Sequence, residues 1–207
     1  MPTPSLPLIV CFGDSLTAGF QSPTPQCPVA VETPYGTFLQ ERLQTRATVL
    51  VSGVCGELTS AMAVRFRRDV LDCKPAYAVV LGGTNDLGWN VHPREVMRNL
   101  LEMYGQAREA AVLAVAVTVP SLRVCDDHIP RRHVLNAMIR EHCAGRRLPC
   151  VDLFTATAEP GTARLAERYS NDGLHLATAG YELLATLLYE QVFKHALTLP
   201  PSGHPAL

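Results

Sequence analysis

The chain has few of the features that mark membrane, nucleic-acid-binding or disordered proteins. No apolar run approaches the roughly 18–20 residues that cross a bilayer, so we expect no membrane span. The net charge is −1 and no basic stripe interleaves with aromatic residues, which argues against nucleic acid as a partner. Only 18% of the residues are charged and 47% are hydrophobic, so the chain has enough apolar sequence for a large core.

The chain also has little that predicts export, disulfides or metal binding. No two of its seven cysteines are spaced Cys-x-x-Cys, so we expect reduced, buried thiols. The first residues carry no basic segment ahead of an apolar one, so we expect no signal peptide and a cytoplasmic location. One acid–histidine cluster, Asp126, Asp127, His128 and His133, enters a predicted helix, where capping and solvent exposure explain it. We therefore expect no metal and no cofactor.

Five apolar, β-branched runs recur at intervals of roughly 30–40 residues, as in successive strand–helix–strand units. They predict strands at Leu8–Phe12, Thr48–Val51, Tyr77–Leu81, Val112–Val119 and Pro149–Leu153. Their continuous apolarity predicts burial on both faces and hence a parallel sheet. Helical patterns lie between and after them, at Pro34–Gln44, Glu57–Leu71, Pro93–Ala110, Pro130–Arg146 and Thr178–His195, the last capped by its threonine.

These elements predict an α/β protein, a three-layer α/β/α sandwich around a five-stranded parallel sheet of flavodoxin-like strand order. We expect a single domain over residues 1–207, with a core at about 8–196 and a loose proline-containing tail at 197–207. The carboxyl ends of the strands meet at one edge of such a sheet, and ligands bind there. The loops that follow the predicted strands are therefore the places to look for chemistry.

The loop after the first strand presents a serine, Ser15, where the backbone turns into a helix. Acyl transfer needs such a nucleophile, a base for its proton, a group that orients the base, and donors for the oxyanion. His175 is the candidate base, and Asp172, three residues earlier, can turn back to hold its imidazole. The backbone N–H groups of Ser15 and Gly56, with the side-chain amide of Asn85, are candidates for the oxyanion hole.

Each of these residues also has a purely structural interpretation. Asp14 or Ser15 can cap a helix, Gly56 can serve only a turn, and His175 can be a polar residue flanking the last helix. Asn85, or its neighbour Asp86, can cap the approach to the helix that begins at Pro93. Four separate loops would then place matching chemistry on one edge by accident, so we favour the catalytic interpretation.

At these positions the chain resembles the SGNH, or GDSL-type, esterases and lipases. The sequence Gly13-Asp14-Ser15-Leu16 is similar to the first block of that family, Gly83-Thr84-Asn85-Asp86 to the third and Asp172-Gly173-Leu174-His175 to the fifth. Gly56 matches the oxyanion glycine of the second block. The family often has an asparagine shortly before that glycine, whereas this chain has Val51-Ser52-Gly53, so Gly53 is a rival; the acidic Glu57 and then Thr59 favour Gly56.

The resemblance implies an SGNH-hydrolase fold and a serine hydrolase of carboxylic esters. The α/β-hydrolase elbow, Gly-x-Ser-x-Gly, fits poorly, because Thr17 stands two residues after the serine. We expect the pocket to lie between the loops 20–33, 88–92 and 120–129, with Leu122 and Ile129 among its apolar walls and with pocket residues Asp14, Phe20, Trp89 and Leu174.

The mixed composition of these loops favours small or short-chain esters as the small-molecule partner. A thioester, a lysophospholipid or an acetylated carbohydrate stays open as the substrate. So does transfer of the acyl group to an acceptor other than water, while a non-catalytic binding protein is the interpretation we favour least. The oligomeric state stays open.

Overall fold

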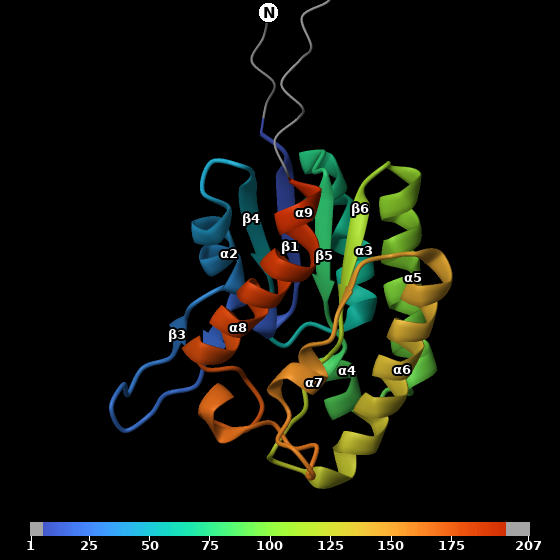
Figure 1. Cartoon of the computed structure of the whole chain (residues 1–207). Helices are drawn as coiled ribbons and strands as arrows, with labels where there is room; N and C mark the ends of the chain where they lie inside the picture. The colour runs from blue at the N-terminus through green and yellow to red at the C-terminus, as the bar shows by residue number, and fades with distance from the viewer. Residues whose placement is uncertain (1–5, 198–207) are drawn as a thin grey trace, which may run out of the picture.

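Parallel strands form the central sheet of the computed structural model, which describes residues 6–197 (Figure 1). The sheet has five strands in the order β4-β1-β5-β6-β7, which confirms the expected flavodoxin-like topology. Its strands are β1 (Leu8–Gly13), β4 (Thr48–Gly53), β5 (Tyr77–Leu81), β6 (Leu113–Val117) and β7 (Cys150–Val151). A separate antiparallel pair, β2 (Phe20–Gln21) and β3 (Val31–Glu32), lies in the loop where the sequence predicts a pocket wall.

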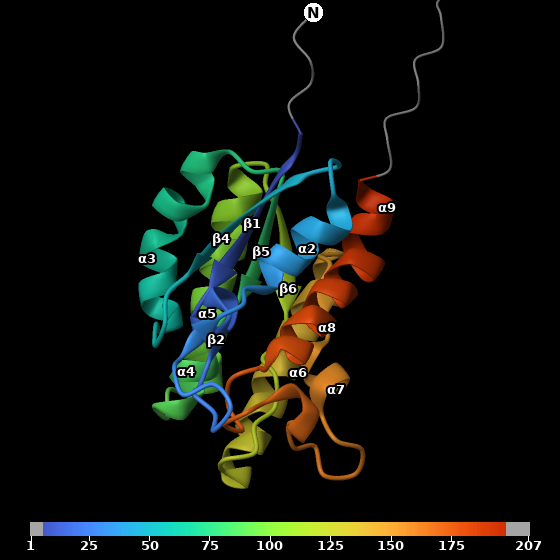
Figure 2. The ribbon, with the colours of Figure 1, turned by 90° about the vertical axis from the view of Figure 1, so that its left-hand side faces the viewer.

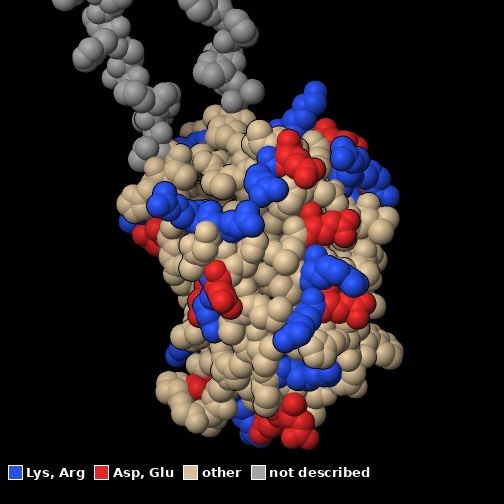
Figure 3. Space-filling view, turned by 90° about the vertical axis from the view of Figure 1, so that its right-hand side faces the viewer, with Lys and Arg blue, Asp and Glu red and all other residues tan. Residues whose placement is uncertain are grey.

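Helices cover both faces of this sheet (Figure 2). They are α1 (Ser15–Ala18), α2 (Tyr35–Leu43), α3 (Thr59–Asp69), α4 (Thr84–Gly88), α5 (Pro93–Glu109), α6 (Ile129–Arg146), α7 (Leu153–Thr157), α8 (Thr178–Leu188) and α9 (Lys194–Ala196). Short 3₁₀ turns occur at Leu71–Cys73, Asp126–His128 and Glu167–Tyr169. On the side formed by α5 and α6, basic and acidic side chains are interspersed (Figure 3).

Alternate residues of each strand feed two cores, because successive side chains of a strand point to opposite faces. In β1, Val10 and Phe12 pack against α3, α5 and α6, whereas Ile9 and Cys11 pack against α2 and α8. All four side chains are fully buried. A strand that supplies both cores must be apolar at every position, which is the continuous pattern seen in the sequence.

Several predicted elements differ from the structure in their bounds. The fourth strand, expected over Val112–Val119, covers Leu113–Val117. The fifth strand is shorter than expected, because the Asp152 carboxylate accepts a hydrogen bond from Thr155 N at 3.1 Å and starts α7. The last helix changes to a π-helical turn at Tyr189–Phe193 before α9. Its N-cap residue is Ala177 rather than Thr178, and the side-chain oxygen of Gln21 accepts the Thr178 N–H from outside the helix.

The expected burial of the cysteines is correct for only part of the set. All seven thiols are free, and Cys11 and Cys143 are buried. The exposed ones are Cys27, Cys55, Cys73 and Cys125, so the prediction of buried thiols is wrong for them. Apart from Leu197, the predicted tail at 197–207 lies outside the described residues. Between residues 6 and 197, none of the helices combines the length and apolarity needed to cross a bilayer.

Candidate active site

The serine of the first loop stands at the start of a helix, and the residue before it provides the cap. Asp14 Oδ1 accepts a hydrogen bond from Leu16 N at 2.9 Å, and Gly19, at φ 82°, closes this short helix at its other end. The capping role therefore belongs to Asp14 rather than to Ser15. Within residues 6–197 the Ser15 hydroxyl has no hydrogen-bond partner, which leaves it available for chemistry.

The predicted base and its orienting residue are in direct contact. His175 Nδ1 lies 2.7 Å from Asp172 Oδ2. The other carboxylate oxygen, Oδ1, accepts the backbone N–H groups of Leu174 at 2.8 Å and His175 at 2.7 Å. Partial burial alone would raise the pKa of Asp172, but these hydrogen bonds, with one from Ser22, hold it well below its usual range. Asp172 therefore stays ionised, and it fixes the position of the imidazole.

A short segment just after the serine turn is fastened to the loop that carries His175. Ser22 Oγ donates to Asp172 Oδ2 at 2.5 Å, and the Phe20 ring lies 4.7 Å from the imidazole, edge to face. The carbonyl oxygen of Phe20 accepts the hydroxyl of Tyr181 at 2.7 Å. The chain thus links its first and last loops, although about 150 residues separate Ser22 from Asp172.

One glycine ends β4 and another lies in the loop after it, and only the second faces open space. A Cβ on Gly53 would lie 2.2 Å from Ala18 N, so this glycine allows β4 to approach α1 closely. Gly56 has φ 76°, is exposed, and a Cβ there would meet nothing within 4 Å. Among the described residues, the backbone N–H groups of Gly56 and Ser15 have no acceptor. These two amides are therefore free to bind an external oxygen.

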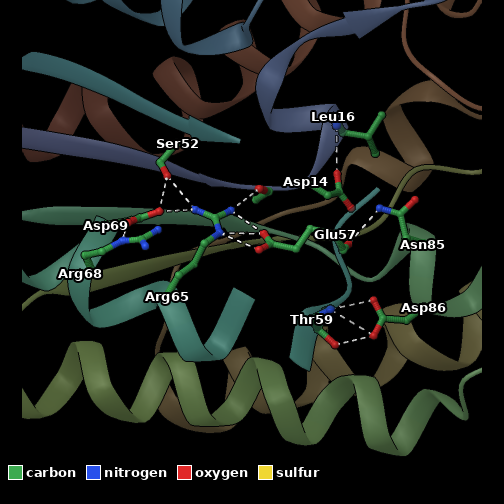
Figure 4. A network of polar contacts seen from close by, with 11 residues as sticks. Asp14, Leu16, Ser52, Glu57, Thr59, Arg65, Arg68, Asp69, Asn85 and Asp86 are labelled. Atoms are coloured by element: carbon green, nitrogen blue, oxygen red, sulfur yellow. Dashed lines mark hydrogen bonds and ion pairs between the residues drawn. The ribbon is translucent and has the colours of Figure 1, made fainter. Parts of the chain in front are cut away.

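The third loop holds its asparagine against the second. Asn85 Nδ2 donates to the carbonyl oxygen of Glu57 at 2.9 Å, which orients the amide and leaves its second N–H available (Figure 4). Asp86 accepts hydrogen bonds from Thr59 N and from Thr59 Oγ1, the latter at 2.6 Å. It therefore binds the start of α3. The alternative that Asn85 or Asp86 caps the approach to α5 is wrong, because His92 fills that position.

A buried arginine ties the ends of β1 and β4 to the second loop. Arg65 donates to the carbonyl oxygen of Gly13 at 2.8 Å and to both carboxylate oxygens of Glu57 (Figure 4). Its other contacts are Asp69 at 2.8 Å and Ser52 at 2.7 Å. This network holds the backbone beside Ser15 and Gly56 in place. The spacing of residues in the sequence did not predict that Arg65 belongs to this network.

Two further ionisable groups are buried near the serine turn. The Asp14 side chain is 0% exposed, its Oδ2 has no hydrogen-bond partner, and burial raises its pKa to about 7. Arg132 is also buried, and it donates to the carbonyl oxygen of Pro120 at 2.9 Å and to Thr84 Oγ1 at 3.3 Å. Burial lowers the pKa of Arg132 to about 10. Asp14 was expected in the substrate pocket, but its carboxylate does not reach the surface.

The predicted pocket walls divide into exposed and buried residues. Trp89 is 78% exposed. Phe20 is half-buried beside His175, and Leu174 is half-buried beside Asp172. Leu122 and Ile129 instead pack with Phe154 in a small buried cluster. They were expected to line the pocket, and that expectation is wrong, because a buried cluster under the loop takes them away from solvent.

The acid–histidine cluster of the sequence does not assemble into a cation site. Asp126 forms an ion pair with Arg164, and the ring of His133 packs on Phe154 at 4.5 Å. Within the described part of the chain, no group of three or more potential ligands is close enough together to hold a metal ion.

The structure brings most of the predicted site residues to one edge of the sheet. Asp172 and His175 are in contact. Ser15, Gly56 and Asn85 each lie a few residues after the carboxyl end of a strand, namely β1, β4 and β5 in that order. The hydroxyl of Ser15 is not hydrogen-bonded to the imidazole, a contact that tightens in many enzymes only when substrate binds. Ser22, Gln21 and Arg132 were missed, because single polar residues in loops or helices give no spacing signal.

Comparison with known proteins places this site in a family context. The model of the GDSL-like lipase/acylhydrolase family matches residues 11–183. The structure of a lipase/acylhydrolase from Enterococcus faecalis is 28% identical, with a TM-score of 0.75 over 93% of this chain and 98% of that one. Est24, a carbohydrate acetylesterase from Sinorhizobium meliloti, is 17% identical, with a TM-score of 0.74 over 91% and 99% of the two chains.

A curated relative covers less of the chain. The uncharacterized lipoprotein YqeF of Bacillus subtilis (strain 168) is 28% identical over 116 residues, which are 53% of this chain and 47% of that protein. The matched region thus spans about half the length of this relative. The cytoplasmic location of the present chain stays a prediction.

Proposed function

We propose that this chain, which belongs to the GDSL-like lipase/acylhydrolase family, is a carboxylic ester hydrolase of small or short-chain esters. The reaction passes through an acyl-enzyme on Ser15. The observation that carries this proposal is the Asp172–His175 pair, which Ser22 links to the segment just after Ser15. Within residues 6–197 the Ser15 hydroxyl has no hydrogen-bond partner.

In the proposed mechanism the Ser15 oxygen attacks the ester carbonyl while His175 Nε2 takes the hydroxyl proton. Asp172 accepts the Nδ1–H, which keeps Nε2 unprotonated before the attack and stabilises the imidazolium afterwards. The imidazolium then protonates the leaving alcohol. Water, activated by the same imidazole, attacks the acyl-enzyme and releases the carboxylic acid, and the serine regains its proton.

The oxyanion formed in both steps is stabilised by donors that are already in place. The free N–H groups of Ser15 and Gly56 and the second N–H of Asn85 are the donors we propose. The contact of Asn85 with Glu57 and the hydrogen bond from Arg65 to Gly13 hold the backbone around these donors, so little reorganisation accompanies the reaction. The crowded position of Gly53 supports Gly56 as the oxyanion glycine.

The surroundings of the site support small acyl groups. Two cavities, of about 720 Å³ and 240 Å³, lie elsewhere among residues 6–197, and no site residue lines either of these two. Val54, Trp89 and Val124 are exposed on loops at this end and can offer apolar contact to a small acyl group. Acetyl esters therefore belong first in a substrate panel, and acetylated carbohydrates belong among them, because the similar Est24 is a carbohydrate acetylesterase.

The test is hydrolysis of nitrophenyl acetate, butyrate and octanoate by the wild type and by Ser15→Ala. We expect the substitution to lower kcat by about 10³-fold or more, because the covalent route is lost. Ser60→Ala, an exposed serine of α3, is the matched control and should keep the wild-type rate. Equal rates in wild type and Ser15→Ala would overturn the nucleophile assignment.

The same assay tests the substrate class separately. Acetate or butyrate should give the highest kcat/KM, and a maximum at octanoate would contradict the preference for short acyl groups while leaving the nucleophile in place. Adding an alcohol acceptor and analysing the products distinguishes hydrolysis from acyl transfer: we expect the free acid as the main product.

A further inference from the structure

A cavity of about 720 Å³ lies at the opposite end of the sheet from Ser15. It is lined by Leu113, the first residue of β6, whereas Ser15 follows the last residue of the parallel strand β1. The volume is in the range of small-molecule sites. The other lining residues come from β6, from the second halves of α5 and α6 and from the turns after these helices, and they include Tyr104, Gly105, Val112 and His142.

The charged residues that line this cavity are all basic. Arg108, Arg146 and Arg147 are exposed, and their guanidinium groups have no ion-pair or hydrogen-bond partner among residues 6–197. No acidic side chain is among the lining residues. On the side of the molecule shown in Figure 3, blue Lys and Arg atoms border an uncharged tan surface, with red Asp and Glu atoms beside them. Three guanidinium groups without a counter-charge favour an anion at the mouth of this cavity.

The wall of the cavity is largely apolar, and a glycine leaves it open. The ring of Tyr104 stacks on His142 with centroids 5.9 Å apart, and Val112 is buried behind them. Gly105 lies inside α5, where glycine is a poor helix former, and a Cβ at this position would meet nothing within 4 Å. Neither crowding nor backbone conformation requires a glycine here, and any larger side chain would take up part of the space.

We propose that this cavity is a binding site for a soluble alkyl carboxylate, separate from the ester-hydrolysing site. The alkyl chain lies along the apolar wall past Gly105, and the carboxylate binds the guanidinium groups of Arg108 and Arg146, whose planar donors match its two oxygens. A second copy of the chain fits this surface less well, because a symmetric contact would bring the like charges of both arginine groups together.

The test uses decanoate as the probe and isothermal titration calorimetry on the full chain. We expect saturable binding of one decanoate per chain, weaker binding of uncharged decanol, and no binding of inorganic phosphate at the same concentration. The double variant Arg108→Gln/Arg146→Gln should weaken decanoate binding by at least about tenfold, because two charge-assisted contacts are lost. Arg98→Gln, an exposed α5 arginine outside the cavity, should bind like the wild type.

Filling the cavity with a larger side chain provides a second, independent test of the proposal. Gly105→Leu should abolish decanoate binding, whereas Gly145→Leu should not, since Gly145 is also a helical glycine in open space but does not line the cavity. Both variants should keep wild-type hydrolysis of nitrophenyl acetate, which shows that they are folded and keeps this test separate from that of the ester-hydrolysing site.

Three outcomes would overturn the proposal. Decanoate binding unchanged by Gly105→Leu or by the double arginine variant would place the carboxylate elsewhere. Decanol binding as tightly as decanoate would remove the role of the arginines. Binding to phosphatidylglycerol vesicles without any binding of monomeric decanoate would assign the surface to a membrane instead.

Discussion

Replacing Asp172 by asparagine should disable the site without changing its shape. The carboxylate Oδ2 accepts from Ser22 Oγ and from His175 Nδ1, so the imidazole proton is held on Nδ1. An asparagine NH₂ group in the place of Oδ2 would donate to Nδ1 and thereby move the imidazole proton to Nε2, where it blocks acceptance of the Ser15 proton. A wrong tautomer of this kind costs about 10⁴ in kcat, equivalent to about 5.5 kcal/mol.

The assay is steady-state hydrolysis of nitrophenyl acetate, with kcat and KM determined separately. KM should change little, because Asp172 orients the base and does not contact the substrate. Asp127→Asn, an exposed aspartate outside the site, is the matched control. Ser22→Ala should lose only about tenfold to a hundredfold, since it removes one hydrogen bond to an ionised group. Retention of more than about a tenth of kcat by Asp172→Asn, or an equal loss in Ser22→Ala, would refute the tautomer argument.

The other predictions concern the supporting residues. Arg65→Met should lower the free energy of unfolding by about 3–5 kcal/mol in urea titrations, because Glu57 is left buried without its partner; a change within error would mean that the network is dispensable. Burial raises the pKa of Asp14 to about 7, so folding favours its protonated form, and the wild type should lose stability relative to Asp14→Asn as the pH rises from about 4 to 7. A pH-independent difference in urea midpoints would contradict this. Gly53→Ala should unfold the chain more readily than Gly56→Ala, whereas Gly56→Ala should cost more in kcat per unit of stability lost; the reverse order would exchange their roles.

The sheet was predictable because its pattern is carried by many residues. Continuous apolarity in runs such as Ile9–Phe12 reflects two cores fed by one strand, and the intervals between runs predicted the crossover helices. The two-residue strand β7 was overestimated, because the carboxylate of Asp152 ends it by starting a helix. A local side-chain hydrogen bond of this kind is not visible in hydrophobic periodicity.

The candidate site was predictable where a role depends on residue type and order along the chain. Asp172 and His175 are three residues apart, so their contact follows from a single turn. The roles of Ser22 and Arg65 depend on contacts between distant segments, and no local pattern marks them. Asp14 was placed in the pocket because it adjoins the serine, whereas its carboxylate turns inward to cap α1.

The central claim is that Ser15 is the nucleophile, and covalent trapping tests it most directly. The protein is treated with a fluorophosphonate, a serine-reactive ester analogue, and the modified peptide is identified by mass spectrometry. We predict one adduct per chain, located on Ser15, with hydrolytic activity lost in proportion to labelling and no adduct in Ser15→Ala. An adduct on a different residue, or full activity in protein labelled on Ser15, would contradict the claim.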